Sequence, residues 1–120
     1  MGMRMGLLRW FTKNWANTDG PTHSDLTPLV LPVTPAEAVE RVRAAVARLP
    51  RWQVEPSETI DRLHLTRRTR TVGYIDDIRL RFLPAGTGTL IHAESRSRVG
   101  IGDLGQNRRN ILELWSELRV

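Results

Sequence analysis

Three stretches in the second half of the chain alternate apolar and polar residues with a period of two. Apolar side chains occupy every second position within residues 63–66, 78–82 and 91–94. Such alternation predicts β-strands of an antiparallel sheet that buries one face and exposes the other. The predicted outer face carries His64, Thr66, Arg79, Arg81, His92, Glu94 and Arg96. The opposite, apolar face needs a cover, which helices can provide.

Two segments predict these helices. Thr34 can cap a helix, Pro35 suits its first position, and Glu37 completes a capping box. Pro50 then ends the helix, because it cannot donate a backbone hydrogen bond. Apolar residues recur at helical spacing in two stripes, Val39, Val42, Val46 and Leu49, then Ile111, Leu114, Trp115 and Leu118.

The predicted order is strand, helix, about four strands, helix. We therefore expect an α+β fold, with a single antiparallel sheet of about 4–5 strands and two helices packed on one face. Residues 29–33 form the first predicted strand, which Pro32 places at an edge of the sheet. Residues 1–27 are expected to form an N-terminal segment and loop, and residues 28–120 a single α+β domain.

The net charge of +5 comes almost wholly from arginine, because Lys13 is the only lysine among 18 basic residues. Arginine suits carboxylates and phosphates, so the charge favours an anionic partner. The near absence of lysine indicates instead a general compositional preference for arginine. A nucleic acid is the less favoured partner, because the predicted outer face lacks the aromatic side chains on which bases stack.

Composition also limits the chemistry of the chain. The absence of cysteine excludes disulfides, a thiolate nucleophile and cysteine-based zinc sites. The three histidines, His23, His64 and His92, show no metal-ligand spacing. We expect no metal site and no cofactor.

A glycine-rich segment, Gly-Ile-Gly-Asp-Leu-Gly at residues 100–105, matches the G-x-G-x-x-G pattern of dinucleotide-binding folds. Those folds need a further parallel strand with an acidic residue about 20 positions on, but only 15 residues follow Gly105. The segment is therefore interpreted as a tight strand-to-helix turn. Asp103 could cap the helix, and Gln106 could complete a capping box.

Residues 7–15 combine apolar side chains, including Trp10 and Trp15, with Arg9 and Lys13. A segment that packs on its own domain or frays is favoured over an interfacial helix that contacts a membrane. The apolar run in this segment is too short for a signal peptide. No apolar run in the sequence approaches the roughly 18 residues of a membrane span. The expected location is cytoplasmic, with a peripheral position at the membrane as the alternative.

Two adjacent carboxylates, Asp76 and Asp77, lie in a predicted strand and so point to opposite faces of the sheet. An inward carboxylate needs a partner, because a buried unpaired charge is very costly. Neighbouring strands offer Arg79, Arg81, Arg96 and Arg98 as bidentate partners. Two interpretations stay open: an Asp–Arg network that sets strand register, or a polar pocket in which an aspartate acts as base or ligand.

Several segments together resemble a known family. They are Leu63 to Arg70, Tyr74 to Ile78, Ser95 to Gly100, Asp103 to Gly105 and Asn107 to Ile111. The chain resembles the bacterial and plastid domain of unknown function 1499 family over roughly Pro28 to Leu118. The resemblance implies a small α+β domain without an established activity, and no catalytic residues carry over from it.

The motifs of this resemblance define the candidate ligand-binding residues, namely Asp76, Asp77, Arg96, Arg98, Asp103, Asn107 and Arg109. The favoured function is a non-enzymatic binding or interaction module that holds a small anionic ligand, a lipid headgroup or a protein partner on the sheet face or at one end of the sheet. One alternative is a small enzyme using Asp76 or Asp77 as acid/base. Another is a weak nucleic-acid binder with a basic sheet face.

Overall fold

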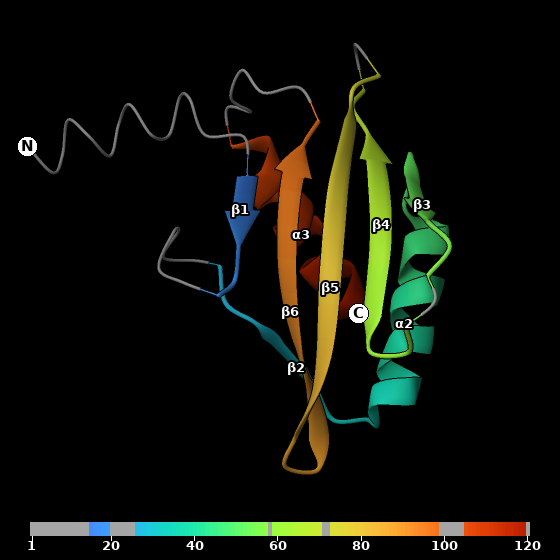
Figure 1. Ribbon diagram of the computed structural model, residues 1–120, viewed down its shortest axis with the longest axis vertical. Coiled ribbons are helices and arrows are strands. Elements are labelled where there is room, and N and C mark those ends of the chain that lie inside the picture. Colours follow the sequence, from blue (N-terminus) through green and yellow to red (C-terminus); the bar gives the residue numbers. More distant parts are fainter. Residues whose placement is uncertain (1–14, 20–25, 58, 71–72, 99–104, 120) are drawn as a thin grey trace, which may run out of the picture.

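The computed structural model describes residues 15–19, 26–57, 59–70, 73–98 and 105–119. One antiparallel sheet lies in front of two helices in Figure 1. The elements are β1 (Trp15–Asn17), β2 (Leu29–Leu31), α2 (Pro35–Arg48), β3 (Trp52–Val54), β4 (Arg62–Arg68), β5 (Ile75–Ala85), β6 (Gly88–Ser97) and α3 (Gln106–Leu118). The α+β class is as predicted.

The sheet has six strands, which corrects the predicted count of about 4–5. Its order is β1-β6-β5-β4-β3, and β2 also pairs with β6. The additional strand is β1, which lies within the segment that the sequence assigns to residues 1–27. It shows no alternating pattern of its own and is a strand because it pairs with the edge of β6, where Ala16 faces Ser95. The ten residues of β6 accommodate both short strands along one edge.

Helix α2 begins and ends as its sequence predicts. The Thr34 hydroxyl accepts a hydrogen bond from the Glu37 amide, Pro35 is the first helical residue, and Leu49 follows the last. Helix α3 begins differently from the prediction. Its N-cap is Gly105 in the left-handed conformation, without a side-chain cap, instead of Asp103, which lies outside the described residues.

The core fills the space between the helices and the inner face of the sheet. Its buried apolar residues include Val42, Val46, Leu65, Ile78, Leu80, Phe82, Ile91, Ile111, Leu114 and Trp115. The polar residues that alternate with them on β4, β5 and β6 lie on the outer face, as the period of two predicts. Helix α3 is also held at its far end, where the Trp115 indole donates to the Thr27 carbonyl at 2.7 Å.

Strands β5 and β6 form the central hairpin of the sheet. Ala85 pairs with Gly88 across a two-residue turn, in which Gly86 adopts a φ of 60°. Gly88 is packed against β2, because a Cβ at this position would lie 2.5 Å from the Leu31 carbonyl oxygen. The turn and the close approach of β2 therefore both depend on glycine.

Replacing Gly88 by alanine should push β2 away from β6. We expect Gly88→Ala to lower the free energy of unfolding by about 1–3 kcal/mol, the usual cost of inserting a methyl group into a packed site. Thr87→Ala, at an exposed position of the same turn, is the matched control and should change it by less than about 0.5 kcal/mol. Urea denaturation measures both, and equal stability of the two variants would contradict the close packing of β2.

Candidate functional site

The two adjacent aspartates of β5 lie on opposite faces of the sheet. Asp76 is on the inner face and only 1% exposed, whereas Asp77 is on the outer face beside Arg98 and His64. The strand pleat thus gives the two carboxylates separate environments.

The inner aspartate belongs to a buried polar cluster, which consists of Asp76, Ser95, Ser97, Asn107 and Asn110. The Asn110 amide donates to Asp76 Oδ2 at 2.8 Å and to Ser95 Oγ at 3.1 Å. Ser95 Oγ donates to Asn107 Oδ1 at 2.6 Å, and Asn107 Nδ2 donates to Ser97 Oγ at 2.8 Å. These bonds fasten the first turn of α3 to the ends of β5 and β6.

This cluster uses asparagines where the sequence suggested arginines. Arg67 is the cross-strand neighbour of Asp76, but its Nε lies 3.6 Å from Glu113 Oε1. The same Glu113 oxygen accepts a hydrogen bond from the Trp52 indole at 2.5 Å. Among the described residues, Arg67 Nε is the one buried side-chain nitrogen or oxygen without a hydrogen-bond partner. With the exception of Arg67 Nε, the buried polar side chains described on the inner face are thus hydrogen-bonded within the protein.

The outer aspartate forms a charged network. Arg98 donates to both oxygens of Asp77, at 2.9 Å and 3.0 Å, and His64 Nε2 lies 2.7 Å from Asp77 Oδ1. The hydrogen bonds from Arg98 lower the pKa of Asp77 from 3.8 to about 2, with a smaller contribution from His64, and outweigh burial, which alone would raise it. Asp77 is therefore ionised at neutral pH and positions both basic side chains.

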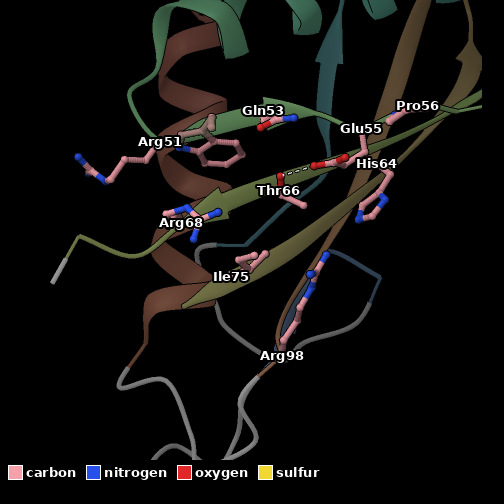
Figure 2. A pocket seen from close by; sticks show the side chains of 10 residues that line it. Arg51, Gln53, Glu55, Pro56, His64, Thr66, Arg68, Ile75 and Arg98 are labelled. Carbon is pink, nitrogen blue, oxygen red and sulfur yellow. Dashed lines mark hydrogen bonds between the residues drawn. The ribbon is translucent and has the colours of Figure 1, made fainter. Parts of the chain in front are cut away.

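A groove of about 550 Å³ opens beside this network on the outer face of β3, β4 and β5. Figure 2 shows His64 and Arg98 toward one end of the groove, and Arg51 and Arg68 toward the other. The Thr66 hydroxyl lies between them and donates to Glu55 Oε1 at 2.7 Å (Figure 2).

The groove is lined by more positive than negative side chains. Its lining includes Arg51, Arg68 and Arg98, against the single carboxylate of Glu55. Arg98 lines the groove and also donates to the Asp77 carboxylate, and Arg68 donates to the Gly73 carbonyl at 3.2 Å. Guanidinium groups that keep further N–H donors in a concave site can bind a carboxylate or a phosphate.

The structure brings together some of the predicted site residues but not all. Asp76 and Asn107 meet in the buried cluster, and Asp77 meets Arg98 on the outer face. Arg96 lies next to Asp77 across the strands, yet its Nε lies 3.6 Å from Glu94. Arg109 donates to Gln106 of its own helix. Asp103 lies outside the described residues.

Sequence reasoning missed most of the groove. Arg51, Gln53 and Glu55 belong to β3 and its flanks, a segment too short to show a pattern. Arg68 follows from the alternation of β4, in which even-numbered residues face outward. Asn110 was also detectable, because its spacing of three from Asn107 places both amides on one side of a helix.

The described residues hold no group of three or more side chains that could bind a metal ion. In the same part of the chain, we find no helix with the length and apolar character needed to span a membrane. The predicted membrane contact through residues 7–15 falls almost wholly outside the described residues.

The chain belongs to the family described as protein of unknown function (DUF1499), whose model matches residues 11–118. No curated protein is similar to it in sequence.

Two solved structures show a distant likeness to the chain. CalU16 from Micromonospora echinospora is 15% identical, with a TM-score of 0.45, over 76% of this chain and 72% of that protein. TTHA0849 from Thermus thermophilus is 12% identical, with a TM-score of 0.42, over 88% of this chain and 97% of that protein.

The buried polar cluster should contribute strongly to stability. We expect Asn110→Ala to lower the free energy of unfolding by about 2–4 kcal/mol, because it leaves Asp76 and Ser95 buried without their amide donor. Gln53→Ala, at an exposed position of β3, should change it by less than about 0.5 kcal/mol. Urea denaturation at neutral pH measures both, and a similar small loss in the two proteins would show that the cluster is not stabilising.

The network around Asp77 should make stability depend on pH in the acid range. Because folding lowers the pKa of Asp77 from 3.8 to about 2, its stabilisation is complete above pH 3.8 and is lost as the pH falls toward 2. At neutral pH, Asp77→Asn should be less stable than the parent by up to about 2 kcal/mol, and the difference should shrink between about pH 4 and pH 2.

Urea titrations at a series of pH values test this expectation, with Asp61→Asn as the control at an exposed carboxylate outside the network. A difference between the parent and Asp77→Asn that stays constant from neutral pH into the acid range would contradict it.

Proposed function

We propose that this protein is a non-enzymatic binding module whose groove on the outer face of β3, β4 and β5 holds a small organic anion. One observation carries the proposal: Arg51, Arg68 and Arg98 line the same hollow, which contains one carboxylate, Glu55. The volume of about 550 Å³ lies within the roughly 300–1,000 Å³ of ordinary ligand sites.

The side chains around the groove suit a ligand with an anionic group and further polar atoms. At one end, Arg68 offers guanidinium donors for a carboxylate or phosphate, while the Arg51 side chain extends outward from the same end (Figure 2). Gln53 and His64 add polar groups along the lining. Asp77 holds Arg98 and His64 in place before any ligand arrives, which lowers the entropic cost of binding.

The alternative with Asp76 or Asp77 as acid/base gains no support from these environments. A general acid or base works best with a pKa near the operating pH. Asp77 has a pKa of about 2, and both of its oxygens are engaged by Arg98. Asp76 is buried and accepts a hydrogen bond from Asn110.

A ligand screen tests the proposal. The parent protein is mixed with inorganic phosphate, di- and tricarboxylates and phosphate monoesters, and thermal shift identifies ligands whose affinity calorimetry then measures. We expect Arg68→Ala to weaken binding of the best ligand by about tenfold or more, because a hydrogen bond to a charged group contributes about 1.5–3 kcal/mol.

Arg41→Ala is the matched control, since Arg41 is an exposed arginine on α2, which covers the other face of the sheet. It should bind like the parent. Absence of any stabilising anion, or an equal loss of affinity in Arg41→Ala, would refute the groove as the binding site. Salt-dependent binding of oligonucleotides without binding of small anions would favour the nucleic-acid alternative instead.

A further inference from the structure

An apolar row crosses the outer face of the sheet at the end opposite the groove. Leu90 of β6 pairs with Val30 of β2 on one side and with Leu83 of β5 on the other. Directly opposed residues of antiparallel strands project to the same side, so the three side chains are neighbours. Val30 is 58% exposed and Leu83 40% exposed. The row lies by the β5–β6 turn, at the lower end of the molecule in Figure 1.

A basic row lies next to the apolar row. Two residues further along each strand, Arg81 pairs with His92 on one side and with Arg62 on the other. Arg79 follows on the same face of β5, opposite His64. Strand geometry places successive rows only about 7 Å apart. This end of the sheet therefore changes from apolar to cationic within the length of one lipid headgroup.

A hollow of about 390 Å³ lies within the basic row. Arg62, Arg79 and Arg81 line it, together with the polar residues Ser57 and Thr59. Arg81 donates to Asp19, and Glu94 also lines the hollow. Within the described part of the chain, neither Arg62 nor Arg79 forms an ion pair. Glu94 lies directly opposite Arg79 on β6, but its carboxylate is 3.6 Å from Arg96 Nε. Two arginines are thus available to an external anion beside exposed leucine and valine side chains.

We propose that this end of the outer face, with its apolar row (Val30, Leu83 and Leu90) and two neighbouring arginines (Arg62 and Arg79), is a peripheral contact for bilayers that carry anionic lipids. Apolar side chains enter the boundary between headgroups and acyl chains, while arginines contact lipid phosphates. Either a small apolar surface or a few basic residues alone gives only marginal membrane binding, so the proposal depends on the two together.

The combination favours a bilayer over other partners. A nucleic acid would use the arginines and leave Val30 and Leu83 in water. A purely apolar protein surface would bury the row but leave Arg62 and Arg79 without counter-charges, which is unfavourable on burial. The apolar row, Arg62 and Arg79 do not line the groove, although His64 borders both hollows. The inference therefore does not depend on the function proposed for the groove.

Co-sedimentation of the full chain with vesicles tests the inference. One set of vesicles is phosphatidylcholine alone, and in the other about a third of the lipid is phosphatidylglycerol. We expect the protein to bind the second set and to be released by salt, with little binding to the first. Arg79→Glu should weaken this binding by about tenfold or more, because each basic residue near an anionic surface contributes strongly.

The matched charge control is Arg41→Glu on α2, which changes the net charge by the same amount on the side of the molecule that faces away. For the apolar row, Leu83→Ser should weaken binding, whereas Tyr74→Ser should not. Tyr74 is 48% exposed and precedes β5, at the end of that strand remote from the hairpin turn. Circular dichroism and urea denaturation verify that each variant is folded, and Arg62→Glu replaces Arg79→Glu if the latter is not.

Selective loss of binding in Arg79→Glu and Leu83→Ser, with both controls unchanged, supports the inference. Equal losses in Arg79→Glu and Arg41→Glu would reduce it to an effect of net charge and overturn it. Absence of binding to both vesicle sets would also overturn it. The same holds if vesicle binding is unchanged and Leu83→Ser alters self-association instead, or Arg79→Glu alters oligonucleotide binding.

Discussion

The register of the β5–β6 hairpin is the constraint on which the rest of the structure depends. A two-residue turn pairs Ala85 with Gly88, and from there ten opposed pairs run to Asp76 and Ser97. A slip of one residue would exchange the two faces of a strand, so that apolar and charged side chains would change places. The same ladder offers the outer edge of β6 to β1 and β2, and it sets the position at which α3 begins to pack.

This register gives neighbouring residues opposite roles. Asp76 faces inward and helps to fasten α3 to the sheet through Asn110 and the two serines of β6. Asp77 faces outward and orients Arg98 and His64 at the wall of the groove. A rigid structural cluster and a preorganised candidate binding surface thus lie back to back across one strand, which suits a site that needs fixed side chains on a rigid element.

The arginines of the outer face likewise fall into two groups, those in ion pairs and those outside them. On the outer face, Arg81, Arg96 and Arg98 are engaged by carboxylates, so they contribute order more than attraction for a partner. Arg51, Arg62, Arg68 and Arg79 form no ion pair within the described residues, and they line two hollows that share His64. The net charge of +5 therefore says less about possible partners than does the position of these four side chains.

Local patterns in the sequence determined the α+β class, the inner and outer faces of β4, β5 and β6, both helices and the cap at Thr34, because period and capping act within a few residues. Only the tertiary structure decided that Trp15–Asn17 is a strand, that Gly105 begins α3, that Asn110 serves Asp76 instead of an arginine, and that residues around β3 complete a groove with Arg98. Apart from the start of α3, each of these features joins segments distant in the chain. The physical reason is that short strands and convergent side chains gain their stability from partners in space, which leave no periodic signal in the sequence.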